Sequence, residues 1–557
     1  MKLTKNHIKL IKIYIKLVKK TGMYPGRAQL DAVGYNRDKI RHYFTNLGHL
    51  KATAKVWAEE NDPDAFGKII DETIFTQERL EQLEDSVKQH KRFIITTAVV
   101  GAPVHQGFLK SIRTYCEHKK AKLLVLPAAD PASTGGDVAT WNLDPSLGAD
   151  SIVFSDVALN DNVFLCSIKL SAKQIDPTTG LDRIGQRNGS FIYASPKQRL
   201  KFMPVSNIKH PHAEMTTGAI TLPRYFQIND KLHSPYMSER TAYIANYDHV
   251  MGAIIVEIDE NGHYHFRQIQ ADKDGAFVDL GDFYKGGRIS KMYAEAISLG
   301  DWHSGETDPT AVKAFKELND VVRAKKLFIH DGFNGLSINH HERERQIRRA
   351  ILAKQGLLNL EAELKKFTQD LDELANWNHV KEVVIVKSNH DIFLDRWLDS
   401  GGYVDDPHNY HVGVDLARAM SMGLNPLTYA THVYGLRAKD KIRWLDMDED
   451  YFIARIQCGA HGHKGPKGSR GNLRGMERAY GLSVTGHAHG PEILRGAWQN
   501  GTLSYLKLSY NSGPSDWVHS STVIYPNGMR QLVNSFEGDW RLQDTWYSLS
   551  KDGLTCE

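Results

Sequence analysis

The sequence predicts an α/β fold, with a layered α/β domain preceded by a small α-helical domain and an α/β to β-rich middle region. At 557 residues the chain is longer than one hydrophobic core normally organises. Its first 58 residues have helical periodicity, and five apolar runs beyond residue 290 end in polar side chains with helical stretches between them. We therefore expect a helical domain over 1–58, a helical connector over 59–91, a middle domain over 92–290, a layered domain over 291–535 and a tail over 536–557.

The composition is that of an ordinary globular protein. Hydrophobic residues make up 41% of the chain and charged residues 24%, which excludes the disordered class. The four cysteines form no Cys-x-x-Cys pair, so neither a disulfide framework nor a cysteine zinc site is indicated. This cysteine usage favours a reducing cytoplasm.

The first twenty residues predict a basic amphipathic helix. Ile8, Ile11, Ile15 and Val18 fall on one helical stripe, while lysines recur every three or four positions elsewhere. These lysines exclude both a signal peptide and a membrane span, so we expect no membrane-spanning segment.

Two further helices are expected at about 25–33 and 36–47, separated by a turn at Gly34, with Asn36 capping the second one. A short helix, a turn and a basic helix form the helix-turn-helix pattern, in which the second helix enters the major groove of DNA. The DNA-binding candidates in this pattern are Arg27, Arg37, Lys39, Arg41 and His42. The alternative is a three-helix cap with a solvated basic face.

The charge distribution favours the DNA-binding interpretation. Residues 1–56 contain thirteen Lys and Arg against two Asp, whereas the formal net charge of the whole chain is only +4. The rest of the chain is therefore net acidic, and such asymmetry suggests that the amino-terminal end faces nucleic acid.

The middle of the chain predicts strands. Apolar runs at 92–101 and 121–128 flank a helical segment, which is the pattern of a β-α-β unit with parallel strands. From about 150 to 290, short apolar runs alternate with turn residues and indicate a β-rich region. We find no catalytic motif there.

Five segments carry the candidate chemistry, because each places metal-ligand residue types directly after an apolar run. They read AEAISLGDWHSG, KKLFIHDGFNG, VKEVVIVKSNHD, YFIARIQCGAHGHKG and GLSVTGHAHG. Polar side chains at the carboxyl ends of several strands are typical of active sites in α/β sheets. The candidates are Asp301, His303, Asp331, Asn389, His390, Asp391, His461, His463, His487 and His489.

This order of motifs resembles the calcineurin-like metallophosphoesterase superfamily, including its nuclease members, over roughly residues 290–520. The resemblance implies that Asp301, His303, Asp331 and His489 hold one metal. It implies that Asp331, Asn389, His461 and His487 hold a second one. It further implies that His390 is the catalytic histidine, with Asp391 orienting its ring.

Two divalent metal ions are the expected cofactors. A bridging carboxylate holds two such ions about 3.5–4 Å apart, where they clamp both oxygens of an in-line displacement. Mixed His, Asp and Asn ligands without thiolates favour Mn²⁺, with Fe, Zn and Mg²⁺ as alternatives.

Two positions depart from the family pattern, and the identity of one metal ligand is undecided. His330 and Ser388 stand where the family usually has glycine. Either His461 or His463 can be the ligand of the fourth segment, and we favour His461 because it follows the strand more closely. The candidate substrate-binding residues are then His463, Lys464, Lys467 and Arg470, although a flexible solvated loop is the alternative there.

These features together predict a metal-dependent DNase, since contacts to the phosphate backbone dominate nucleic-acid affinity. The whole chain also resembles a family of early-infection proteins of tequintaviruses. That resemblance implies a phage DNase that degrades host DNA in the bacterial cytoplasm, as a homo-oligomer. The alternatives are a phosphatase or small-molecule phosphodiesterase and a non-enzymatic DNA-binding regulator.

Overall fold

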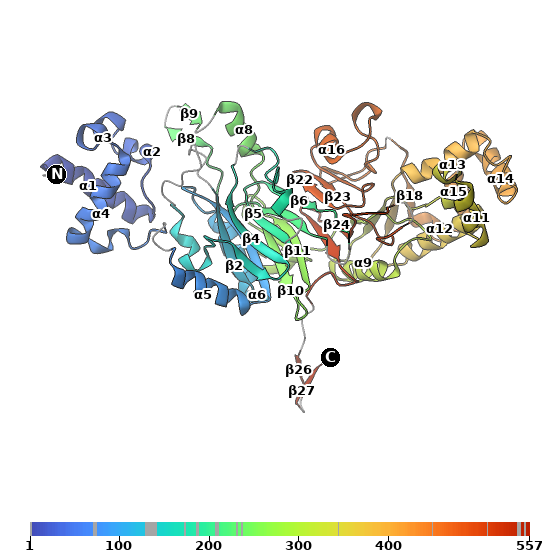
Figure 1. Cartoon of the computed structure of the whole chain (residues 1–557), viewed down its shortest axis with the longest axis horizontal. Helices are drawn as coiled ribbons and strands as arrows, with labels where there is room; N and C mark the ends of the chain where they lie inside the picture. The colour runs from blue at the N-terminus through green and yellow to red at the C-terminus, as the bar shows by residue number, and fades with distance from the viewer. Residues whose placement is uncertain are drawn as a thin grey trace.

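The computed structural model describes residues 3–70, 75–128, 142–171, 174–184, 189–206, 211–229, 232–235, 238–343, 345–447, 449–508, 511–542, 547–550 and 553–556. The molecule is elongated in Figure 1, with the amino-terminal helices at one end, the sheets in the middle and a group of helices at the other end. Helices and several mixed sheets alternate along the chain, which confirms the predicted α/β class.

The amino-terminal domain consists of four helices: α1 (Lys5–Thr21), α2 (Arg27–Ala32), α3 (Arg37–Tyr43) and α4 (Leu47–Asn61). Ile11, Ile15 and Val18 are buried as their spacing predicts, together with Leu10 and Tyr14. They form the core of this domain with residues of α3 and α4, including Ile40, Leu50 and Ala54.

The third helix is shorter than predicted. Asn36 caps α3 by accepting from the Lys39 backbone N–H at 3.0 Å, as expected. The helix ends at Tyr43 because Phe44 has an extended backbone, and Asn46 then caps the new helix α4 by accepting from the His49 N–H. The segment predicted as one helix over 36–47 is therefore a helix, a short turn and the start of another helix.

The predicted β-α-β unit is confirmed. After α5 (Gln77–Lys88), strands β1 (Arg92–Val99) and β2 (Lys122–Ala128) are parallel and flank α6 (Gln106–Lys119). Two antiparallel strands, β10 (Gly252–Ile258) and β11 (Tyr264–Gln270), extend this sheet in the order β11-β10-β1-β2.

A six-stranded sheet has the order β18-β17-β16-β15-β24-β25. Its strands are β15 (Ala296–Ser298), β16 (Lys326–Ile329), β17 (Glu382–Ile385), β18 (Ile442–Trp444), β24 (His519–Ile524) and β25 (Arg530–Ser535). Strands β15 to β18 are parallel, so their carboxyl ends meet at one edge of the sheet.

A ten-stranded sheet has the order β19-β20-β21-β23-β22-β6-β7-β5-β4-β3. From the middle region it takes β3 (Val157–Asn160), β4 (Val163–Lys169), β5 (Ser190–Ala194), β6 (Gln198–Phe202) and β7 (Ala213–Thr217). From the carboxyl-terminal region it takes β19 (Phe452–Ile453), β20 (Ile456–Gln457), β21 (Ser483–Thr485), β22 (Glu492–Leu494) and β23 (Ala497–Gln499).

Strands β6 and β22 join the two regions by antiparallel pairing, with Leu200 opposite Ile493. Strands from either side of residue 290 thus belong to one sheet. The domain boundaries stay predictions, but the middle region and the layered region share backbone hydrogen bonds.

The two large sheets pack face to face. Phe328 and Val384 of the six-stranded sheet share a buried cluster with Val484 and Trp498 of the ten-stranded sheet. The opposite face of the six-stranded sheet packs against α9 (Pro309–Val322) and α12 (Leu360–Ala375), as the alternation of side chains along strands requires.

The remaining elements surround these layers. They are β8 (Phe226–Asn229), β9 (Leu232–Pro235), α8 (Glu239–Tyr247), β12 (Phe277–Asp279), β13 (Asp282–Lys285), β14 (Arg288–Lys291), α10 (His340–Arg343), α11 (Gln346–Lys354), α13 (Asn389–Asp399), α14 (Tyr410–Ser421), α15 (Pro426–Val433), α16 (Leu473–Tyr480), β26 (Tyr547–Ser550) and β27 (Gly553–Cys556). Strands β26 and β27 form a hairpin that projects from the body of the molecule (Figure 1). None of the helices within the described ranges has the length and apolarity to cross a bilayer.

A buried ionic network joins the four-stranded sheet, which contains β1, β10 and β11, to the six-stranded sheet. Arg267 of β11 binds Asp279 with two guanidinium nitrogens and donates to Glu257 at 2.8 Å, and Arg92 also donates to Glu257. Gln531 of β25 completes the connection by donating to Asp279 at 3.0 Å.

Candidate metal centre

The five predicted segments converge at the strand ends of the two large sheets. The loop after β15 carries Asp301 and His303, the loop after β16 carries Asp331, and Asn389 begins α13 just after β17. From the other sheet, His461 follows β20, and His487 and His489 follow β21. Segments up to 190 residues apart in the sequence therefore meet at one place.

The first cluster consists of Asp301, His303, Asp331 and His489, all of them buried, with candidate ligand atoms within 4.8 Å of one another. His489 Nε2 lies 3.0 Å from Asp301 Oδ2 and 3.1 Å from His303 Nε2. His303 Nε2 lies 3.8 Å from Asp331 Oδ2. Two carboxylates and two imidazoles thus point at a common centre.

The second cluster consists of Asp331, His461 and His487. His461 Nε2 lies 3.3 Å from Asp331 Oδ2. The amide oxygen of Asn389 belongs to the same group, since it lies 2.9 Å from His461 Nε2 and 3.1 Å from His487 Nδ1. Asp331 is common to both clusters.

The buried carboxylates of Asp301 and Asp331 indicate that a cation fits here. The two residues are 0% and 1% exposed, and one oxygen of each, Oδ1, has no hydrogen-bond partner. An unpaired buried charge is costly, and buried charges in proteins are paired or bind metals. A metal ion among these oxygens and imidazole nitrogens would satisfy them.

Electrostatics within the cluster point the same way. Burial alone would raise the pKa of Asp331, but the neighbouring imidazoles, above all His461, hold that pKa well below its ordinary value. Burial alone would lower the pKa of His461, but Asp331 raises it to about 9. The Asp331 carboxylate therefore attracts positive charge. A bound cation would replace the proton on His461.

The candidate ligands His303 and His487 are neutral imidazoles. Burial lowers the pKa of His303 to about 3 and that of His487 to about 4. Each ring therefore keeps a lone pair near neutral pH, which ligation of a metal requires.

The backbone at the ligands is unusual. His303, Asp331, His487 and His489 have φ values of 49°, 45°, 82° and 61°. Residues other than glycine rarely occupy this left-handed region, and such strain gathers at functional sites. Four of the seven candidate ligands of the two clusters thus have a costly backbone conformation.

His390 lies beside the first cluster, and its ring nitrogen contacts a backbone oxygen. The two ring centroids of His390 and His303 are 4.6 Å apart, and His390 Nδ1 lies 2.7 Å from the backbone oxygen of Asn334. Asp391 is the third residue of α13, so its carboxylate turns back and accepts from the Ser388 N–H at 2.9 Å. Asp391 therefore caps α13, and its expected role in orienting the His390 ring stays a prediction.

The structure distinguishes His461 from His463. His461 contacts Asp331 and Asn389, whereas the ring centroid of His463 is 5.3 Å from that of His461 and 5.9 Å from that of His487. Both ring nitrogens of His463 are buried without a hydrogen-bond partner. His463 therefore lies next to the second cluster, with its polar atoms available to a bound group.

The basic residues that follow His463 lie on an exposed loop. Lys464 and Arg470 form a backbone bridge across it, and Lys467 lies at its turn. All three side chains are exposed, so the loop presents positive charge to solvent beside the cluster.

The chain is similar to Protein A1 of Escherichia phage T5. The two proteins are 29% identical over an alignment of 525 residues, which covers 87% of this chain and 87% of the relative. No protein-family model matches the chain, and no solved structure matches it significantly. The similarity to Protein A1 supports the expectation of a tequintavirus-like bacteriophage protein.

Two residues near Asp331, Asn334 and His330, contact candidate ligands although the sequence analysis assigned them no role in the site. The Asn334 amide oxygen lies 3.3 Å from His303 Nδ1, and its nitrogen donates to Glu306 at 3.1 Å. His330 is fully buried, with Nε2 3.1 Å from the Ser298 hydroxyl and its ring stacked on His461 at 5.6 Å. Both stand in the segment that contains Asp331, and their position next to a ligand was the available signal.

The amino-terminal DNA-binding candidates lie apart from the metal clusters. Arg37, Lys39, Arg41 and His42 are exposed on α3, and Lys39 Nζ donates to the Gly34 oxygen at 2.9 Å. Arg27 begins α2, but its side chain lies outside the described residues. Figure 1 shows these helices at the end of the molecule opposite α13, whose first residue is Asn389.

Proposed function

We propose that this protein is a metal-dependent phosphoesterase of the calcineurin-like type that hydrolyses phosphodiester bonds of DNA at a dinuclear site. The observation that carries the proposal is the position of Asp331, which belongs to both ligand clusters. A carboxylate shared by two sets of ligands is the arrangement that places two divalent ions next to each other.

The residues of this chain have separate roles in such a reaction. Asp301, His303, Asp331 and His489 would hold one ion, and Asp331, Asn389, His461 and His487 would hold the other. Two bound divalent ions, with Mn²⁺ favoured, supply Lewis-acid stabilisation of the phosphate oxygens and a water of lowered pKa.

In the proposed reaction His390 would move a proton. Its Nδ1–H donates to the Asn334 oxygen, which fixes the ring and assigns the exchangeable proton to Nε2. A cationic ring in this orientation can protonate the leaving oxygen from Nε2. His463 and the exposed residues Lys464, Lys467 and Arg470 would bind the phosphate groups on either side of the cleaved bond.

DNA is the proposed substrate for three reasons. The exposed basic loop beside the cluster suits a polyanion, and the basic helix α3 offers a second contact with DNA. The similarity to a phage protein agrees with a role in infection. We therefore propose that the protein degrades host DNA in the bacterial cytoplasm early in infection, as a homo-oligomer.

The proposal is tested with Asp331→Asn, which removes the shared negative charge and keeps the size of the side chain. End-labelled linear DNA and closed circular DNA are incubated with the protein in Mn²⁺, and bound manganese is counted by mass spectrometry. We expect the variant to cleave about a hundredfold more slowly or worse, because both ions depend on this carboxylate. Asp399→Asn, at the exposed far end of α13, is the matched control.

Three results would contradict the proposal. If DNA stays intact with every divalent metal tested, the nuclease proposal is rejected. Faster hydrolysis of p-nitrophenyl phosphate than of DNA would indicate a phosphatase. Equal cleavage by wild type and Asp331→Asn would show that the clusters are not the active site.

A further inference from the structure

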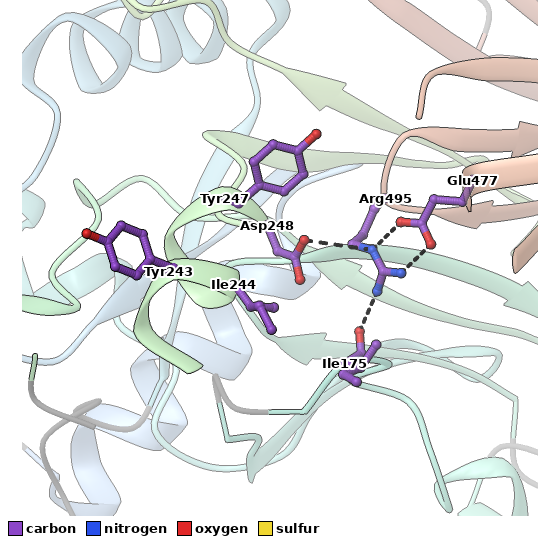
Figure 2. A pocket seen from close by; sticks show the side chains of 7 residues that line it. All are labelled: Ile175, Tyr243, Ile244, Tyr247, Asp248, Glu477 and Arg495. Carbon is purple, nitrogen blue, oxygen red and sulfur yellow. Dashed lines mark hydrogen bonds and ion pairs between the residues drawn. The ribbon is translucent and has the colours of Figure 1, made fainter. Parts of the chain in front are cut away.

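A pocket of about 490 Å³ lies between α8 and α16, away from the metal ligands. It is lined by Ile175, Tyr243, Ile244, Tyr247, Asp248, Glu477 and Arg495. Figure 2 shows Asp248 of the α8 side and Glu477 of α16 converging on Arg495, while the tyrosine rings project outward from α8. Its volume is in the range of small-ligand sites, roughly 300–1,000 Å³.

The walls of the pocket expose large apolar side chains. Tyr247 is 86% exposed, Tyr243 is 61% exposed and Ile175 is 57% exposed. Apolar side chains exposed singly are common, but several around one pocket mark a binding site. Tyr243 is held in place by an edge contact with Phe226, whose ring centroid is 5.1 Å away.

The floor of the pocket is polar, rigid and balanced in charge. Glu477 binds the Arg495 guanidinium with both carboxylate oxygens, and Arg495 also donates to the Ile175 backbone oxygen at 2.8 Å. Asp248 pairs with Lys197 at 3.1 Å. Because two acidic groups offset two basic ones, the floor favours an uncharged polar group over a phosphate.

The two helices that border the pocket also carry exposed arginines. Arg474 and Arg478 are exposed on α16, and Arg240 is exposed on α8. Helix α16 directly follows the basic loop that begins at His463, beside the second metal cluster. In Figure 1 the helices α3, α2, α8 and α16 lie along the same long edge of the molecule, from the helix-turn-helix-like module toward the metal-binding half.

We propose that this pocket binds unpaired bases of a single DNA strand, with Tyr243 and Tyr247 stacking on the bases while the flanking arginines contact the backbone. Aromatic rings combined with a basic track are the usual means of binding single strands, because every base has a face that can stack. The inference rests on the proposed function and adds to it. The strand would pass between the basic helix α3 and the metal centre.

The test uses metal-free full-length protein, so that cleavage does not interfere. Binding of a fluorescent single-stranded oligonucleotide is measured by polarisation for wild type, for Tyr243→Ala/Tyr247→Ala and for Tyr243→Phe/Tyr247→Phe. We expect the alanine variant to lose about tenfold or more in affinity and the phenylalanine variant to retain it. Tyr410→Ala, at an exposed tyrosine of α14, is the matched control.

An oligonucleotide with abasic sites separates bases from backbone. Wild type and the alanine variant should bind it equally weakly, because neither can stack on a missing base. If the alanine variant binds normal single strands within about twofold of wild type, or if the phenylalanine variant loses as much, the pocket is not a base site. A change of oligomeric size in the alanine variant with unchanged DNA binding would assign the pocket to protein contacts and overturn the proposal.

Hydrolysis of bis(p-nitrophenyl) phosphate with Mn²⁺ keeps this inference distinct from the proposed function. The tyrosine variants should hydrolyse this small diester at the wild-type rate, since it does not reach the pocket. If wild type does not hydrolyse the diester but the alanine variant still loses single-strand binding, the base site is supported and the nuclease function is rejected. If wild type hydrolyses the diester but the alanine variant binds single strands as wild type does, the nuclease function is supported and the base site is rejected.

Discussion

His390 and its partner Asn334 show how single residues set the chemistry of the site. A side-chain partner for His390 was expected, but a backbone oxygen takes this place. A peptide carbonyl cannot be ionised, so it fixes the tautomer of His390 without adding negative charge next to the metal clusters. The side chain of the same asparagine contacts His303, so Asn334 aligns a candidate metal ligand and the proposed acid together.

His390→Ala should lower kcat by about 10²–10⁴, the usual contribution of general acid catalysis, while bound manganese stays unchanged because His390 is in neither cluster. Turnover of a diester with a good leaving group, such as bis(p-nitrophenyl) phosphate, should fall much less than turnover of DNA. Steady-state kinetics on both substrates provide the measurement. His432→Ala, at an exposed histidine of α15, is the control, and an equal loss on both substrates would argue against the acid role.

At the scale of elements, the site depends on loops that approach one another very closely. The loop after β21 passes directly over Asp301, and the backbone N–H of His487 donates to Asp301 Oδ2 at 2.7 Å. Gly486 permits this approach, since a Cβ at its position would lie 2.1 Å from Asp301 Oδ1 and 2.9 Å from the His330 Cβ. Neither neighbour can move easily, because both side chains are fully buried.

Gly486→Ala should therefore displace the loop and separate His487 and His489 from Asp301. We expect a loss of metal affinity of about tenfold or more, with a corresponding loss of hydrolysis at limiting Mn²⁺. Calorimetric titration with Mn²⁺ gives the affinity, and circular dichroism reports whether the fold is kept. Gly67→Ala, where the nearest atom to a new Cβ is 3.6 Å away, is the control, and unchanged affinity in Gly486→Ala would refute the argument.

At the scale of the whole molecule, buried ionic contacts connect the sheets. Burial alone would raise the pKa of Glu257, but Arg267 and Arg92 lower it to about 2, from an ordinary value near 4.5. The folded state therefore holds the carboxylate more strongly in its charged form than the unfolded state does. This contribution to stability is complete above about pH 4.5 and disappears as the pH falls toward 2.

Glu257→Gln should lower the free energy of unfolding by about 3 kcal/mol at pH 7, because it removes the buried negative charge that Arg92 and Arg267 share, and Arg267 keeps only its pair with Asp279. The difference between variant and wild type should shrink as the pH falls from 4.5 to 2. Urea unfolding at several pH values measures both effects. Glu260→Gln removes an exposed ion pair with Lys91 and should change stability little, whereas equal effects of the two substitutions would contradict the prediction.

The sequence predicted the local features of this fold better than the long-range ones. Asp331, His487 and the other candidate ligands could be selected from the sequence because each follows an apolar strand, a signal contained in a few adjacent residues. The pairing of β6 with β22 had no such signal, because both strands are short and almost three hundred residues separate them. The pocket at Tyr247 was missed for the same reason, since its walls come from distant segments.

The pairing of β6 with β22 has a consequence for how this protein can be divided. Cutting the chain near residue 290 would bare the edge of Glu492–Leu494, and an open edge of this kind recruits other strands and promotes aggregation. The histidines that follow β20 and β21 are attached to the same sheet. The carboxyl-terminal half that carries the ligand clusters therefore does not separate cleanly from the middle of the chain, and we expect recombination between related phages to exchange the two together.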